Sequence, residues 1–372
     1  MDYSIYDAAF HTGAARPASK RERRLAVKSF STSSFSLVLF SVISSVVIVG
    51  VEIALLLFCP HELLAEILES PYFLWGMQIL GPYAVAFPIL LLMTKDLPRA
   101  RYKSSKMGAG EFITVFVISS GVMVFGSIVS NVILGVIEYF TGSPIPDVSS
   151  EMILNSPTWL VLLVVVVIGP IVEEIIFRKV FIDRMSLYGD RLAIAVSSVL
   201  FGLFHGNIAQ LVYATALGVI LGYVYTRTRK IKYSIILHML INFFGTMPSI
   251  IMLDCADTID KITLKYPDGV LPEDAIADSI EIFKASITVL SLTAIQYGLA
   301  IAGIIVFIVL TAKGAYKIPK NCEIKLPKRT VLRAVFFNAG TLLFVLFSVL
   351  TVLLSITPDI ISLLTDGAYS VY

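Results

Sequence analysis

Long runs of apolar residues recur along the chain and alternate with short polar segments rich in lysine and arginine. A bilayer core about 30 Å thick requires roughly 20 apolar residues of helix to cross it. The pattern therefore predicts an all-α fold, a polytopic transmembrane bundle of about nine helices. The predicted spans are 34–58, 71–93, 111–140, 158–182, 192–209, 211–226, 233–252, 286–311 and 334–357.

The basic residues predict the orientation of this bundle. If the nine helices alternate in direction, one side receives all of the 29 Lys and Arg residues except Lys261, Lys265 and Lys284. Basic residues in short loops are retained on the cytoplasmic side. We therefore expect the N-terminus inside and the C-terminus outside, with an acidic extracytoplasmic loop at 253–285.

Composition supports a membrane protein. Apolar residues make up 57% of the chain and charged residues 15%, and the mean hydropathy is +0.85. A soluble domain has about 25% charged residues. These values exclude a soluble enzyme, a disordered chain and a disulfide scaffold. The net charge of +2 gives no indication of a nucleic-acid partner, so the expected surroundings are the lipid bilayer.

Cysteine usage adds little to this interpretation. The three cysteines, Cys59, Cys255 and Cys322, form no CxxC motif and no metal-binding spacing. Cys59 and Cys255 are predicted on the same outer side, where a disulfide could form. Unpaired thiols at helix ends are the favoured interpretation.

Six ionisable or amide side chains inside predicted spans are candidates for function, because such groups are costly in a bilayer. They are Glu173, Glu174, Arg178, His205, His238 and Asn242. Further polar residues in spans are assigned to packing or interfacial solvation: Glu52, Gln78, Asn131, Glu138, Gln296 and Asn338.

The spacing of these residues indicates different roles. Glu174 and Arg178 are four residues apart with the acid first, which favours an ion pair on one helix. Glu173 lies about 100° around the helix from Glu174 and stays free for chemistry. His238 and Asn242 share one helix face. One glutamate, two histidines and an asparagine on three helices could activate water and stabilise an oxyanion.

Two simpler interpretations remain open for these side chains. A histidine inside a membrane often serves only to hydrogen-bond neighbouring helices. A pair of glutamates could instead form the proton or ion site of a secondary transporter, although no repeated halves are evident.

At these residues the sequence resembles the CPBP family of intramembrane proteases, which comprises the type II CAAX prenyl endopeptidases and the bacteriocin-processing and immunity (Abi) proteins. The EExxxR motif occupies 173–178, FxxxH runs from Phe201 to His205, and HxxxN runs from His238 to Asn242. The three motifs occur in this order in apolar helices, and the resemblance covers roughly residues 155–250.

The resemblance implies an endopeptidase whose site lies in a cavity within the helical bundle. Glu173 would activate the attacking water with His205, and His238 and Asn242 would stabilise the oxyanion. Glu174, Arg178 and Phe201 would provide structural support, so their expected role is architectural.

The predicted spans and charges divide the chain into five parts, and the resemblance marks one of them as a catalytic core. The parts are a basic cytoplasmic tail (1–30), three N-terminal helices (31–150), a catalytic four-helix core (151–252), the acidic loop (253–285), and two C-terminal helices with a tail (286–372).

The cofactor and the partners are less constrained. Glu173, His205 and His238 could hold zinc in a His₂Glu arrangement, but no HExxH is present and a glutamate protease needs no metal. The expected partner is a membrane-associated peptide or protein substrate, either CAAX-type or bacteriocin-like, in a multi-pass protein of the cell membrane. A non-cleaving immunity or scaffold protein remains an alternative, and the oligomeric state is open.

Overall fold

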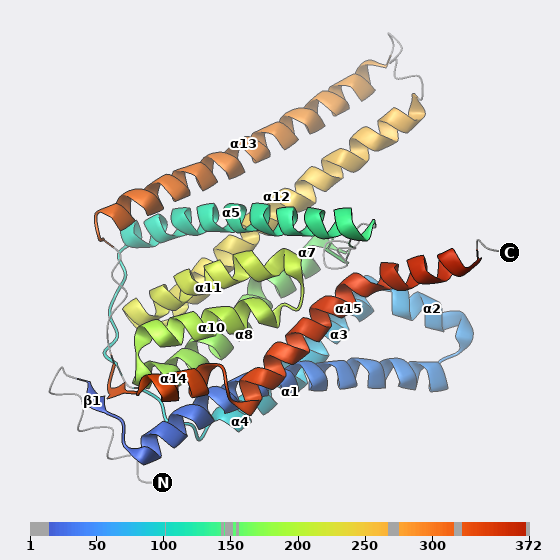
Figure 1. The fold of residues 1–372 in the computed structure, drawn as a ribbon. Helices are drawn as coiled ribbons and strands as arrows, with labels where there is room; N and C mark the ends of the chain where they lie inside the picture. Colours follow the sequence, from blue (N-terminus) through green and yellow to red (C-terminus); the bar gives the residue numbers. More distant parts are fainter. Residues whose placement is uncertain are drawn as a thin grey trace.

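The computed structural model describes residues 15–100, 102–142, 145, 152–153, 156–266, 275–315 and 322–369. Within these ranges the chain is almost entirely helical (Figure 1), and β1 (Arg16–Pro17) and β2 (Ile324–Lys325) form one short parallel pair. Seven of the described helices are long and apolar enough to cross a membrane, or eight if one bent pair is a single span. The predicted all-α polytopic bundle is confirmed.

The N-terminal part of the bundle contains two spans. α1 (Lys20–Phe58) begins with a capping box, in which the Ser19 hydroxyl accepts from the Glu22 N–H and the Glu22 carboxylate accepts from the Ser19 N–H. The second span is a continuous helix with a π-helical middle. After α1, the elements in order are α2 (His61–Glu69), α3 (Pro71–Ile79), η3 (Leu80–Ala86) and α4 (Phe87–Thr94).

α5 (Ala109–Thr141) is followed by a span, Thr158–Tyr188, that changes helical register several times. Two of its parts are π-helical, a form that is rare and concentrates at functional sites. Its segments are α7 (Thr158–Val161), η4 (Leu162–Ile168), α8 (Gly169–Glu174), η5 (Ile175–Ile182), α9 (Asp183–Met185) and η6 (Ser186–Tyr188).

The remaining helices surround this span. In Figure 1, α8, α10 and α11 lie in the centre, with α5 on one side and α1, α14 and α15 on the other, and the α12–α13 hairpin extends beyond them. These helices are α10 (Asp190–Phe204), α11 (Ile208–Thr228), α12 (Ile231–Lys265), α13 (Ile276–Ala312), α14 (Lys328–Val335) and α15 (Ala339–Tyr369).

The predicted number of nine spans is not confirmed. The fifth predicted span, 192–209, corresponds to α10, whose 15 residues extend only about 22 Å and so fall short of a bilayer core. α10 ends early because Gly206, with φ 65°, turns the chain directly after His205. It then packs very closely on α11: a Cβ added to Gly202 would lie 1.9 Å from the Thr215 hydroxyl oxygen.

The segments predicted as a tail (1–30) and as an acidic loop (253–285) contain more helix than expected. α1 already begins at Lys20, inside the segment interpreted as a tail. α12 continues to Lys265 and α13 starts at Ile276, so helices extend far into the segment 253–285. All three cysteines are free thiols.

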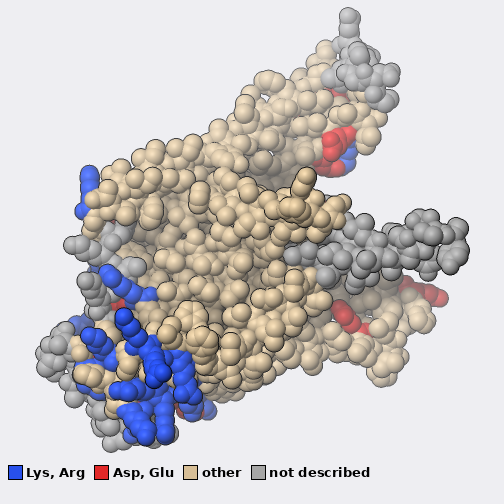
Figure 2. Space-filling model, viewed as in Figure 1, with Lys and Arg blue, Asp and Glu red and all other residues tan. Residues whose placement is uncertain are grey.

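Charged side chains are separated between the two ends of the molecule. Figure 2 shows Lys and Arg gathered at the end where α1 and α14 begin, whereas most visible Asp and Glu lie at the opposite end. That the basic end faces the cytoplasm stays a prediction from the positions of the Lys and Arg residues.

We predict that the two ends of α12 lie on opposite sides of the membrane. In a background with all native cysteines replaced by serine, Lys232→Cys should react with membrane-permeant thiol reagents and resist impermeant ones in intact cells. Asp257→Cys, near the other end of α12 with a side chain 58% exposed, should react with both. Labelling of Lys232→Cys by an impermeant reagent would reverse the orientation.

Candidate active site

The predicted site residues come from three helices that meet in the centre of the bundle. Glu173 and Glu174 end α8, and Arg178 lies one turn later in η5. α10 supplies Phe201, and His205 directly follows its last residue. α12 supplies the remaining two residues, His238 and Asn242. The contacts below connect all of these side chains except that of Asn242, which contacts a backbone carbonyl instead.

An ion pair lies at the base of the site. Arg178 Nη1 is 3.2 Å from Glu174 Oε1, and both side chains are almost completely buried. The i,i+4 pairing predicted from the spacing is therefore present. Arg178 Nη2 also points at the backbone oxygen of Gly218 in α11, at 3.5 Å. A buried ion pair is stable only while both charges are present, so each partner fixes the other.

His238 lies between the two glutamates. Its Nδ1 is 3.1 Å from Glu174 Oε1, and its Nε2 is 3.7 Å from Glu173 Oε2. Because a carboxylate only accepts, Nδ1 carries the proton that is shared with Glu174. Glu174 thus orients the imidazole and directs Nε2 toward Glu173, in addition to its expected architectural role.

His205 is oriented by its own helix. Its Nδ1 is 2.8 Å from the backbone oxygen of Phe201, which can only accept a hydrogen bond. Nδ1 must therefore be the donor, and in the neutral ring Nε2 keeps its lone pair. The backbone of α10 thus leaves one basic nitrogen of His205 available.

The ring of Phe201 connects the three parts of the site. The Arg178 guanidinium carbon lies 4.5 Å from the ring centroid, a cation–π distance. The His205 and His238 rings pack edge-on at centroid distances of 4.9 and 5.8 Å. Phe201 is 1% exposed, so this aromatic core fixes the positions of both histidines relative to the ion pair.

Asn242 makes a contact that the sequence did not predict. Its Nδ2 donates to the backbone oxygen of Val165 in η4, at 2.9 Å. In a π-helix this oxygen would accept from the residue five positions later, which is Pro170 and has no N–H. Asn242 therefore satisfies a carbonyl that the proline leaves without a helical partner, and it joins α12 to η4.

Tyr83 in η3 is near the site and was not among the predicted residues. A Cβ added to Gly169 would lie 3.3 Å from Tyr83 Oη and 4.0 Å from Glu173 Oε1, so both oxygens lie beside the same glycine. The only signal in the sequence was a tyrosine following Pro82 in an apolar span. A tyrosine in such a span is hard to distinguish from one that anchors a helix at the interface.

The zinc ligand set is not assembled in the part of the chain that the structure describes. No group of three or more His, Cys, Asp and Glu side chains there is arranged to hold a metal ion, and this includes Glu173, His205 and His238. Nδ1 of each histidine is engaged, in His205 with a backbone oxygen and in His238 with Glu174, so Nε2 is the ring nitrogen that each histidine presents to the site.

We predict that the ion pair makes a large, non-additive contribution to stability. Arg178→Ala should lower the free energy of unfolding by about 3–5 kcal/mol, because Glu174 is left as an unpaired buried charge. Glu174→Ala should have a similar effect, and the double variant should cost little more than either single one. Thermal unfolding in detergent measures the three values.

Lys261→Ala provides the matched control for this cycle. Lys261 pairs with Asp257 at 2.6 Å, four residues earlier on α12, but both side chains are exposed, by 72% and 58%. Its loss should leave thermal unfolding nearly unchanged. Additive losses from the Glu174 and Arg178 variants would show that the two side chains do not stabilise each other.

In comparisons with known proteins, the part of the chain that matches a family is the part that forms this site. The family model described as type II CAAX prenyl endopeptidase Rce1-like matches residues 155–244, which contain all three motifs. The putative membrane peptidase YdiL of Bacillus subtilis (strain 168) is 30% identical over 175 residues, covering 45% of this chain and 70% of that protein.

A second relative covers less of the chain. The membrane-embedded CAAX protease MroQ of Staphylococcus aureus (strain USA300) is 30% identical over 131 residues, which are 33% of this chain and 52% of that protein. No solved structure matches. Together with the apolar helices, these relatives identify a multi-pass protein of the cell membrane. The resemblance seen in the motifs is thereby confirmed: the chain belongs to the Rce1-like family of type II CAAX prenyl endopeptidases, which are membrane-embedded proteases.

Proposed function

We propose that this chain is an intramembrane endopeptidase in which Glu173 and His205 activate water and His238 and Asn242 stabilise the oxyanion. The observation that carries the proposal is the meeting of the three motifs: His238 bridges Glu173 and Glu174, and Phe201 contacts both histidines. Family membership supports the reaction class, and the geometry supports the division of roles.

The two adjacent glutamates differ in a way that favours Glu173 as the base. The Glu174 side chain is fully buried and is held by Arg178 and His238. The Glu173 side chain is 20% exposed, and its Oε2 is 3.7 Å from His238 Nε2. This separation is too long for a direct hydrogen bond, so His238 does not hold Glu173 as it holds Glu174. Glu173 is thus the carboxylate that can accept a proton from an attacking water.

His205 is suited to carry that proton onward. Its Nε2 has the free lone pair in the neutral ring, because Nδ1 donates to the Phe201 carbonyl. Once His205 has taken up the proton at Nε2, it can act as a general acid toward the leaving amine. Its position at the end of α10 places it beside the turn at Gly206.

His238 and Asn242 are suited to stabilise negative charge. When the His238 ring is protonated, Nε2 becomes a donor, and Glu174 on the opposite nitrogen balances the positive charge. The Asn242 amide has two N–H groups, and one donates to the Val165 oxygen. The second remains for an oxyanion, while the first fixes the amide in place.

The substrate we propose is a membrane-associated peptide or protein, either of CAAX type or bacteriocin-like. A site formed by the centres of membrane helices is accessible to segments that are themselves in or on the bilayer. The basic end of the molecule further suggests that the substrate enters from the cytoplasmic side or from the inner leaflet.

We predict that Glu173→Gln lowers the rate of peptide cleavage by about 10²–10⁴-fold, because the amide cannot accept the proton of the attacking water. The assay uses purified protein in detergent and a library of membrane-anchored peptides, with cleavage followed by mass spectrometry. Glu52→Gln, which alters another glutamate in a membrane helix, should keep full activity.

Two results would contradict this proposal. Full cleavage by Glu173→Gln would remove the proposed base, and absence of cleavage by the wild-type protein across the library would favour a non-cleaving peptide-binding protein. Metal analysis of the same preparations, with activity measured before and after chelation, decides separately whether a metal takes part.

A further inference from the structure

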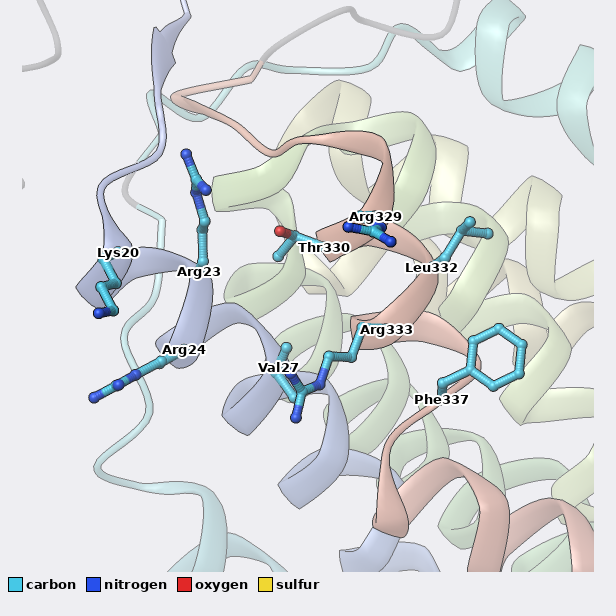
Figure 3. A pocket seen from close by; sticks show the side chains of 9 residues that line it. All are labelled: Lys20, Arg23, Arg24, Val27, Arg329, Thr330, Leu332, Arg333 and Phe337. Carbon is cyan, nitrogen blue, oxygen red and sulfur yellow. The ribbon is translucent and has the colours of Figure 1, made fainter.

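A cleft with five cationic side chains lies between the start of α1 and α14, away from the candidate active site. Its volume is about 930 Å³. Figure 3 shows residues of α1 along one wall and residues of α14 and the following turn along the other. The cleft is lined by Lys20, Arg23, Arg24, Val27, Arg329, Thr330, Leu332, Arg333 and Phe337.

The helical spacing concentrates the charge in this cleft. Lys20, Arg23 and Arg24 are at positions i, i+3 and i+4 of α1, so they share one face. Arg329 and Arg333 are four residues apart on α14, where like charges repel. The α14 helix packs directly against α1 and brings the two faces together.

No acidic group of the described chain neutralises this cluster. None of the five cations makes an ion pair with a described side chain; Arg23 donates from Nε to the backbone oxygen of Ala18, at 3.2 Å. Glu22, the acidic residue of the first turn, is buried and engaged by Arg16 and by the N-terminal cap. Within the described residues nothing relieves the mutual repulsion, and an anion bound in the cleft would do so.

Apolar groups at the cleft indicate the nature of that anion. Leu332 and Phe337 line the cleft and are 49% and 67% exposed, and Phe336 beside them is 57% exposed. The membrane helix α15 follows directly, bent by 43° from α14. Cationic groups therefore lie next to exposed apolar side chains where the chain enters the apolar part of the bundle, an arrangement suited to an amphiphile.

We propose that this cleft binds the phosphate headgroup of an anionic phospholipid from the leaflet at the basic end. The guanidinium and ammonium groups hold the phosphate, as basic pockets between membrane helices do. The acyl chains lie against Leu332, Phe336 and Phe337. The bound lipid joins α1 to α14 and lowers the repulsion between them.

The test compares lipids on the purified full-length chain in detergent. Phosphatidylglycerol should raise the unfolding temperature saturably, and native mass spectrometry should detect it bound to the protein. Phosphatidylcholine with the same acyl chains and inorganic phosphate alone should each have much smaller effects. An equal effect of phosphatidylcholine, or a full effect of inorganic phosphate, would overturn the proposal.

Variants locate the binding site. Arg329→Gln combined with Arg333→Gln should weaken phosphatidylglycerol binding about 30-fold, given roughly 1 kcal/mol for each basic residue near an anionic surface. Arg329→Lys with Arg333→Lys should retain most of the binding and shows that the helix still folds. Lys103→Gln with Lys106→Gln removes the same charge from an exposed loop and should leave binding unchanged. Equal loss in the loop variant would indicate a non-specific charge effect and refute the site.

Discussion

The buried ion pair between Glu174 and Arg178 is the interaction on which the rest of the site depends. It lies in the fully buried centre of the bundle, where a single unpaired charge would be strongly destabilising. Arg178 fixes Glu174, and Glu174 in turn holds His238 by Nδ1. The same guanidinium packs on Phe201, which contacts both histidines. One pair of charges thus determines where an aromatic ring and two imidazoles can lie.

The irregular geometry of the Thr158–Tyr188 span gives the site its second constraint. Pro170 cannot donate a backbone hydrogen bond, and the helix around it adopts π turns. The carbonyl of Val165 then becomes available to a side chain of a neighbouring helix, and Asn242 takes it. In a helix with regular hydrogen bonding this oxygen would already have a backbone partner. The irregular hydrogen bonding of one helix thus provides a specific contact with another.

Much of this arrangement could be predicted from spacing, and some could not. The i,i+4 order of Glu174 and Arg178 predicted their ion pair, because both residues lie on one helix. The contact of His238 with Glu174 could not be predicted, because it depends on the relative rotation of two helices. The predicted span 192–209 continues past the end of α10 at Phe204, because the turn there depends on the backbone conformation of Gly206. The approach of Tyr83 to Gly169 likewise depends on tertiary packing.

The helices outside the matched region hold the helices of the candidate site in place. α15 packs on α1 so closely that a Cβ added to Gly340 would lie 1.9 Å from the backbone oxygen of Ser31. Farther along, α15 reaches the turn after His205: a Cβ added to Gly206 would lie 2.9 Å from Thr351 Cγ2. The turn that ends α10 thus rests on a helix that is itself fixed by α1. Because Thr351 leaves little room beside Gly206, the terminal helices restrict the position of His205.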